Sequence, residues 1–232
     1  MAGKDLPPSP LALPLPEMPA VAGVRLGSGR AEIRYKARED VTMMTFPAGT
    51  TVAGVFTKNR CPGAPVDWCR AALRGGKARA LVVTAGNSNV FTGRAGRETC
   101  AATAKAMAEL AGCKPNEVFL SSTGVIGERL PTEKLVAALP PLFGQLVDDG
   151  WAAAARAIMT TDTFPKGATR TARIGEATVT VSGIAKGSGM IAPDMATMLC
   201  FLATDAKVPA AVLQGILAKG VGRSFNCVTV DS

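Results

Sequence analysis

Hydrophobic residues occur along the chain in short runs and in longer periodic stretches, a pattern that predicts strands interleaved with helices. One segment, 174–184, alternates apolar and polar positions like a half-buried strand, with Ala177, Val179 and Val181 on one face and Thr178, Thr180 and Ser182 on the other. The other predicted strands are short apolar runs bounded by turn residues, at 41–46, 51–57, 80–84, 117–121 and 198–203. Pro47-Ala48-Gly49 separates the first two of these runs, which predicts a hairpin.

Apolar residues recur at helical spacing in four further stretches, at 98–112, 132–148, 151–159 and 208–221. Gly112 stands where a helix C-terminus is expected, because glycine adopts the left-handed backbone conformation without strain. Strands and helices follow one another without regular alternation, so the sequence favours the α+β class over a doubly wound sheet. With no repeat and no clear linker, one compact domain is the simplest interpretation.

The first twenty residues form a proline-rich N-terminal extension, 1–20, whose prolines exclude a helix. Prolines also interrupt its short apolar segment, so we expect no secretory signal. The apolar runs of the chain are far shorter than the roughly 20 residues that span a bilayer. We therefore expect a soluble, cytoplasmic protein without a membrane partner.

The amino-acid composition narrows the range of functions that the protein could have. Of the 232 residues only 5% are aromatic, and the net charge of +8 is scattered along the chain. The densest basic group, Arg70, Arg74, Lys77 and Arg79, is either a solvated helix end and turn or the rim of an anion-binding site. Few stacking residues and no clustered basic face argue against nucleic acid as a partner, although a basic nucleic-acid- or protein-binding module remains an alternative.

Cysteine and histidine usage limits the chemistry further. The six cysteines form no CxxC pair, which favours buried reduced thiols over a metal site. The chain has no histidine, which excludes Ser-His-Asp and Cys-His catalytic arrangements within it. Proton transfer near neutral pH then requires a shifted carboxyl, a shifted lysine or an α-amino group.

The most unusual stretch is Lys186-Gly187-Ser188-Gly189-Met190-Ile191-Ala192-Pro193-Asp194-Met195-Ala196-Thr197-Met198-Leu199. A threonine such as Thr197 at the start of an apolar run is usually an ordinary strand residue. The whole stretch, however, resembles the autocleavage motif of the ornithine acetyltransferase family, the bifunctional glutamate N-acetyltransferases of arginine biosynthesis. Other segments resemble family segments in the same order, namely 33–36, 52–60, 86–89, 91–93, 122–127 and 160–163.

This resemblance implies a set of functional residues. The precursor would be cut between Ala196 and Thr197, and Thr197 would become the catalytic nucleophile. Thr123 and Gly124 match the family's oxyanion hole, and Thr163, Lys186 and Thr197 match substrate-binding positions. A lysine suits the α-carboxylates of the implied substrates, N-acetylornithine and glutamate. By contrast, Lys166 and Arg170 are interpreted as solvated loop charges.

Cleavage would supply the base that the missing histidine cannot. A freed α-amino group titrates near 7.7 to 8.0 in model peptides, so it can accept the hydroxyl proton of the same threonine. The resemblance implies no cofactor, although some members also use acetyl-CoA as a co-substrate.

The resemblance also implies an architecture, an αββα layered sandwich that is incomplete here. Residues 21–196 would form the alpha subunit and 197–232 the start of a truncated beta subunit, with two of each in a heterotetramer. The family's C-terminal Glu and Asn positions have no counterpart before Ser232, so we expect uncovered apolar surface. The alternatives are a self-cleaving aminopeptidase or amidase, and an inactive truncated remnant.

Overall fold

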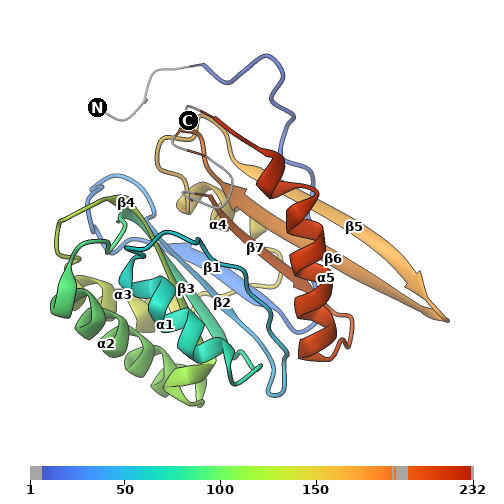
Figure 1. Cartoon of the computed structure of the whole chain (residues 1–232), viewed down its shortest axis with the longest axis horizontal. Helices are drawn as coiled ribbons and strands as arrows, with labels where there is room; N and C mark the ends of the chain where they lie inside the picture. The colour runs from blue at the N-terminus through green and yellow to red at the C-terminus, as the bar shows by residue number, and fades with distance from the viewer. Residues whose placement is uncertain (1–6, 190, 192–197, 231–232) are drawn as a thin grey trace.

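A four-stranded sheet forms the centre of the fold (Figure 1). The computed structural model describes residues 7–189, 191 and 198–230. In the central sheet β1 (Arg25–Gly29), β2 (Val41–Thr45) and β3 (Ala80–Asn87) are antiparallel neighbours, and β4 (Val118–Val125) is parallel to β3. A parallel pair requires a long crossover connection, which the helix α2 (Gly93–Ala111) provides. The spatial order of the four strands is β1-β2-β3-β4.

One face of this sheet is covered by two helices, α2 (Gly93–Ala111) and α3 (Thr132–Phe143). Met43 of β2 and Val82 of β3 pack there with Met107 and Leu139, all of them at most 1% exposed. The helix α2 ends at Gly112 in the left-handed conformation, as the sequence predicts. The resulting core fixes the sheet on which β4 carries Thr123 and Gly124.

The free edge of the central sheet is protected by α1 (Ala64–Leu73). Cys69 Sγ donates to the Leu120 carbonyl at 3.0 Å and accepts from the Leu120 amide at 3.3 Å. Trp68 Nε1 donates to the Val118 carbonyl at 2.9 Å. Burial raises the pKa of the Cys69 thiol to about 11, so it remains protonated at neutral pH. Side chains thus satisfy backbone groups of β4 that a bare edge would expose.

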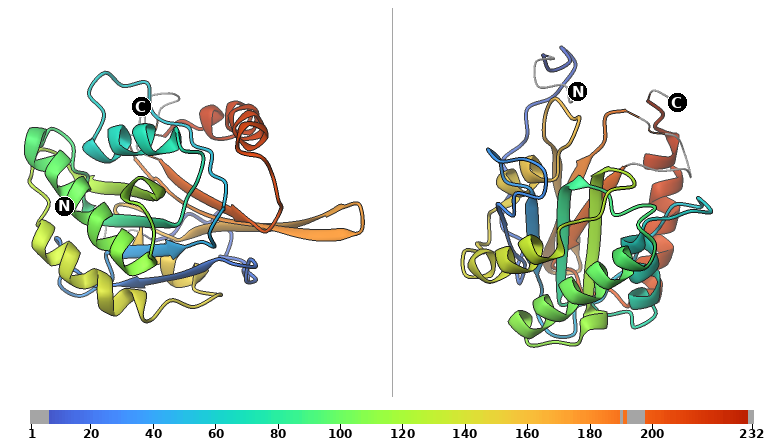
Figure 2. Two further views of the ribbon diagram at one scale, coloured as in Figure 1. Left: turned by 90° about the horizontal axis from the view of Figure 1, so that it is seen from below. Right: turned by 90° about the vertical axis from the view of Figure 1, so that its left-hand side faces the viewer.

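The second sheet is antiparallel and packs on the other face of the first, with the helix α4 (Trp151–Ala157) in the same core. Ile184 faces inward and meets Met44, Val83 and Trp151. The helix α5 (Ala210–Gly222) runs beside this sheet (Figures 1 and 2). These layers confirm the predicted α+β class and αββα arrangement. The remaining elements are β5 (Lys166–Ile174), β6 (Ala177–Lys186), β7 (Leu199–Thr204) and α5 (Ala210–Gly222).

Most predicted elements are present with shifted ends, but several predictions are wrong. The segment 51–57 forms no strand in the structure as described, because its backbone pairs at Thr51 alone, with Lys77. The helix expected over 132–148 ends at Phe143. The strands β1 and β5 and the helix α1 were not predicted. For the strands, pairing with a neighbouring strand, rather than the local apolar pattern, decides the outcome.

The predicted strand 174–184 is also corrected. A turn at 175–176 separates β5 from β6, so the segment begins at the tip of a hairpin. Its apolar face is not the core face, since Val181 is 39% exposed whereas Ser182 is fully buried. Ser182, Ile184 and Lys186, the even-numbered residues in the second half of β6, are at most 2% exposed, and this parity brings Lys186 inward.

Apolar surface is exposed on the second sheet and α5, as expected. Among the described residues of α5 none is buried, and Ile216 is 60% exposed. Leu202 on the outward face of β7 is 55% exposed. Within the described ranges no helix is both long enough and apolar enough to cross a membrane.

The remaining expectations concern the extension, the basic group and the thiols. Residues 7–20 form no helix, and Met18 is buried in the second core. The basic group begins in the last turn of α1 and continues past its end, so it is a helix end and turn, and Arg70, Lys77 and Arg79 donate to the carbonyls of Thr57, Gly49 and Phe46. All six cysteines are free, with Cys69 and Cys100 buried and Cys61 and Cys227 exposed.

Candidate functional site

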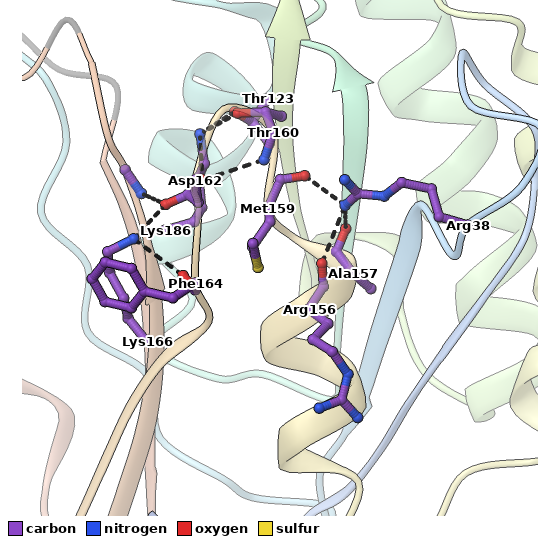
Figure 3. Close-up of polar contacts among 11 residues, drawn as sticks. Arg38, Thr123, Arg156, Ala157, Met159, Thr160, Asp162, Phe164, Lys166 and Lys186 are labelled. Carbon is purple, nitrogen blue, oxygen red and sulfur yellow. Dashed lines mark hydrogen bonds and ion pairs between the residues drawn. The ribbon is translucent and has the colours of Figure 1, made fainter. Parts of the chain in front are cut away.

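Lys186, at the end of β6, reaches from the second sheet to the first (Figure 3). Its Nζ donates to Thr123 Oγ1 on β4 at 3.1 Å and to Thr160 Oγ1 at 2.8 Å. The residue is 2% exposed, so its ammonium depends on these partners rather than on water. The structure therefore joins two predicted site residues that are 63 positions apart in the sequence.

Asp162 supplies the countercharge. Its side chain is fully buried, and Oδ2 lies 3.9 Å from Lys186 Nζ. Oδ1 accepts from Lys166 Nζ and from the Gly187 amide, each at 2.7 Å, and Oδ2 accepts from the Thr160 amide at 3.2 Å. One carboxylate thus binds both lysines and both backbone segments that flank the site. A buried ion pair is retained in this way only when hydrogen bonds satisfy its remaining polar atoms.

The environment shifts the pKa values of Asp162 and Lys186. Burial opposes ionisation of Asp162, but hydrogen bonds from Lys166 and Gly187 and the charges of Lys166 and Lys186 together hold its pKa below the ordinary value. Burial lowers the pKa of Lys186, and the neighbouring Asp162 offsets part of that effect. Asp162 is therefore ionised at neutral pH, and Lys186 loses its proton more readily than an exposed lysine does.

The end of β4 is held tightly against the end of β3. Gly124 has φ +134°, and a Cβ built on it would lie 2.3 Å from the Gly86 carbonyl carbon. Only glycine fits this close approach of two backbones. The Ser88 amide and hydroxyl both donate to the Val125 carbonyl, and Asn87 Nδ2 donates to the Glu128 carbonyl. These contacts fix Thr123, which is 4% exposed, opposite Lys186.

The other predicted residues are placed as follows. Thr163 is partly buried and directly follows Asp162. The predicted cleavage site, Ala196 and Thr197, lies outside the described residues. Leu199, two positions later in the chain, pairs with Lys186 in the β6–β7 ladder. A Cβ added at Gly187 would lie 3.6 Å from Met198 Cβ. The first described residues after the predicted cleavage site, Met198 and Leu199, therefore lie beside Gly187 and Lys186.

Sequence reasoning missed three members of this cluster, Thr160, Asp162 and Lys166. The interpretation of Lys166 as a solvated loop charge is wrong, because it begins β5, is 30% exposed at its side chain and pairs with Asp162. Arg170 is exposed as expected, but it lies within β5 rather than in a loop. One feature of the sequence could have identified Asp162. In the run Thr160-Thr161-Asp162-Thr163 it is a single acidic residue among uncharged neighbours.

The cluster suits an oxygen-bearing ligand. Because the hydroxyls of Thr123 and Thr160 accept from Lys186, each can donate its own proton to another acceptor. Such donors, together with an ammonium, match a carboxylate or a developing oxyanion. Over the described positions no three acidic or thiol side chains gather in a way that would hold a metal ion.

Comparison with known proteins agrees with this arrangement. The model of the ArgJ family matches residues 25–232. The "arginine biosynthesis bifunctional protein ArgJ" of Gluconobacter oxydans is 59% identical over 99% of the chain, which covers 54% of that protein. The chain thus spans about half the length of the curated relatives it matches.

Two solved structures share the fold. The bifunctional protein argJ of Bacillus halodurans superimposes with a TM-score of 0.68 at 29% identity, over 77% of this chain and 92% of that one. The ornithine acetyltransferase of Mycobacterium tuberculosis, solved with ornithine, gives 0.65 at 33% identity, over 78% and 94%. The family match covers well over half of the sequence, and the chain therefore belongs to the ArgJ family.

Proposed function

We propose that the protein acts in arginine biosynthesis and transfers an acetyl group from N-acetylornithine to glutamate. Thr197 Oγ attacks the acetyl carbonyl, the amide C–N bond breaks, and ornithine leaves after its nitrogen takes up a proton. Glutamate's amine then attacks the acetyl ester on Thr197, which yields N-acetylglutamate and restores the hydroxyl. The α-amino group of Thr197, freed by cleavage, takes and returns the hydroxyl proton.

The observation that carries this proposal is the contact between Lys186 and Thr123. Two residues with expected roles in substrate binding and oxyanion stabilisation meet in one buried cluster. The names of the relatives support the reaction class, since the compared proteins are an arginine-biosynthesis protein and an ornithine acetyltransferase. Ordinary core packing gives no reason to bury a lysine between threonine hydroxyls, because desolvating its charge is costly.

Each remaining residue has a proposed role. Lys186 and Thr163 bind the substrate, with the Lys186 ammonium facing the α-carboxylate. Thr123 and Gly124 donate to the oxyanion of the tetrahedral intermediate, where a missing donor typically costs about 100-fold or more in kcat. Asp162 keeps Lys186 charged and in place, which its buried carboxylate supports.

Self-cleavage and assembly belong to the same proposal. Thr197 Oγ attacks the Ala196 carbonyl, and water hydrolyses the resulting ester, which leaves Thr197 with a free amino group. The β6–β7 ladder, where Leu199 pairs with Lys186, would hold the two fragments together. We further propose a heterotetramer of two alpha and two beta subunits, a cytoplasmic location, and acetyl-CoA as a second acetyl donor.

The proposal is tested on the protein at its full natural length. Mass spectrometry should find a fragment that begins at Thr197, and a coupled assay should detect N-acetylglutamate formed from N-acetylornithine and glutamate. The variant Thr197→Ala should remain uncut and inactive. The matched control, Thr171→Ala, removes the hydroxyl of an exposed threonine on β5 and should leave cleavage and transfer unchanged.

Other results would contradict the proposal. An uncut Thr197→Ala protein that still transfers acetyl groups would exclude Thr197 as the nucleophile. Hydrolysis of small amino-acid amides without transfer to glutamate would favour an aminopeptidase or amidase. A wild-type protein that is neither cut nor active would favour the inactive remnant. Omitting acetyl-CoA separates the two donors, because transfer from N-acetylornithine does not need it.

A further inference from the structure

Arg38 makes an unusual contact outside the Lys186 cluster. Its Nη2 donates to three carbonyls, those of Arg156 at 3.1 Å, Ala157 at 3.3 Å and Met159 at 2.6 Å (Figure 3). These carbonyls belong to the end of α4 and to the residues just after it. One guanidinium nitrogen therefore binds a turn of the chain that lies more than a hundred positions away in the sequence.

This turn leads directly into the functional site. Thr160, the next residue after Met159, accepts from Lys186 Nζ through its hydroxyl and donates to Asp162 through its amide. The last carbonyls of a helix lack the donors that a following helical turn would supply, although the Arg156 carbonyl also accepts from the Met159 amide at 3.3 Å. Arg38 supplies those donors, and its positive charge also suits the negative end of the helix dipole.

Arg38 is itself held in place. Its guanidinium carbon lies 4.8 Å from the centre of the Tyr35 ring, and its Nε donates to the Glu39 carbonyl at 3.3 Å. The fully buried Asp40 carboxylate accepts from the Ala31 and Ile33 amides, each at 2.7 Å, which fixes the loop that carries Tyr35 and Arg38. The loop thus presents the guanidinium on a supported backbone.

We propose that Arg38 is a positioning residue for Lys186. By binding the carbonyls at 156, 157 and 159, it sets the path of the chain into Thr160, whose hydroxyl and amide in turn hold Lys186 and Asp162. The hydrogen bonds of Arg38 go to the carbonyls of Glu39, Arg156, Ala157 and Met159 rather than to the Lys186 cluster, so Arg38 acts through Thr160. The proposal rests on the proposed function insofar as Lys186 binds substrate, but the geometry that it predicts for Lys186 does not.

Two variants and a control test this role in the full-length protein. Arg38→Gln keeps a hydrogen-bonding side chain but loses the charge and the guanidinium fork, and Arg38→Lys keeps the charge with a single donor group. The control is Arg156→Gln, which removes an exposed arginine side chain from the same turn while its carbonyl remains. We expect Arg38→Gln to raise KM for N-acetylornithine on the order of tenfold, with kcat changed less. Arg38→Lys should restore part of the loss, and the control should match wild type.

A second measurement does not depend on activity. In protein with ¹³C-labelled lysine, the Lys186 Cε signal, assigned by its absence in Lys186→Met, reports the pKa of the ammonium. The charged groups that face it are Asp162 and Lys166. When Thr160 is released and water enters, burial no longer depresses this pKa as strongly. It should therefore rise toward the ordinary lysine value in Arg38→Gln and stay unchanged in Arg156→Gln.

The outcomes separate the two proposals. A folded Arg38→Gln protein whose Lys186 pKa and KM equal those of wild type would overturn the positioning role, even if its melting temperature falls. If Arg38→Gln does not fold, the same two measurements on Arg38→Lys decide, because equality with wild type in both again contradicts the role. A shifted Lys186 pKa in a protein without acetyl transfer would support the role of Arg38 while rejecting the proposed function.

Discussion

The two sheets of the molecule differ in how completely they are covered. The first sheet has apolar cores on both faces, and residues such as Leu26, Val41 and Met43 are fully buried. The second sheet is buried only where its inner face meets the first, around Ile184 and Lys186. Its hairpin tip and outward face are exposed, as Ile174 and Leu202 show.

This difference explains where the polar cluster lies. The first sheet provides a rigid backbone that holds Thr123 in position, since its cores resist movement. The second sheet carries Lys186 at the one end where it is anchored, so the cluster also acts as part of that anchor. The attachment of the second sheet and the proposed function therefore involve the same residues, with Asp162 at their centre.

The strongest test of this comparison is to remove the charge that joins the sheets. Asp162→Asn leaves Lys186 buried without its countercharge, which should lower the free energy of unfolding by about 3–5 kcal/mol. Urea unfolding followed by circular dichroism measures this change. A double variant, Asp162→Asn with Lys186→Met, should recover part of the loss because the unpaired buried charge is gone.

The matched control removes an acidic group from the exposed part of the same sheet. Glu176 pairs with Arg173 at 2.9 Å near the hairpin tip, and its side chain is 96% exposed. Glu176→Gln should leave the unfolding midpoint unchanged, since exposed ion pairs contribute little. If both variants lose the same stability, the two ends of the second sheet do not differ as we infer.

Truncating one leucine in each region should also change the free energy of unfolding by different amounts, and this difference should be smaller. Leu139→Ala, at a fully buried position of the first core, should cost about 2–5 kcal/mol through lost burial and a cavity. Leu202→Ala, at a position that is 55% exposed, should cost less than about 1 kcal/mol. Urea midpoints measure both. A large loss for Leu202→Ala would mean that the outward face of β7 is covered in solution.

The sequence predicts the covered region better than the exposed one. Strands β2, β3 and β4 and the helix α2 have apolar runs or periodic faces that match their burial. The strand β5 reads Lys-Gly-Ala-Thr-Arg-Thr-Ala-Arg-Ile and is mostly exposed, so it has no apolar alternation to detect. The segment 51–57 has a strand-like composition but lacks a strand beside it, and strand propensity depends on such a neighbour.

The site was predictable in part for a similar reason. Thr123 and Lys186 could be named from the resemblance, but their contact depends on how two sheets stack, which neither segment encodes alone. Asp162 and Arg38 act through hydrogen bonds to backbone groups far away in the sequence, and such bonds leave no local pattern. Lys166 was misjudged because its partner lies four residues away in a loop whose path was unknown.

A smaller loss of stability is expected when the contact between α5 and the rest of the molecule is broken. Gln214 Oε1 accepts from the Gly54 amide and its Nε2 donates to the Gly54 carbonyl, both at 3.0 Å, and Thr51 Oγ1 donates to the Val208 carbonyl at 2.8 Å. Gln214→Leu breaks two partly buried hydrogen bonds and should lower the free energy of unfolding by about 1–2 kcal/mol. Hydrogen exchange should show faster exchange in α5 and unchanged rates in α2, whereas equal rates in α5 would contradict a polar attachment.

The smallest expected change in stability is confined to acidic pH. The pKa of Asp162 is lower in the folded protein than its ordinary value of about 3.9, so its contribution to stability is complete above that pH. Below it the unfolded chain binds a proton first, and the contribution is lost as the pH falls through the folded pKa. The ¹³C signal of the Asp162 carboxyl should therefore titrate below the ordinary range, and in Lys166→Met it should move upward because a donor and a charge are gone. A carboxyl that titrates above the ordinary value in wild type would mean that the effect of burial on the Asp162 pKa outweighs the effect of its hydrogen bonds and of the two lysine charges.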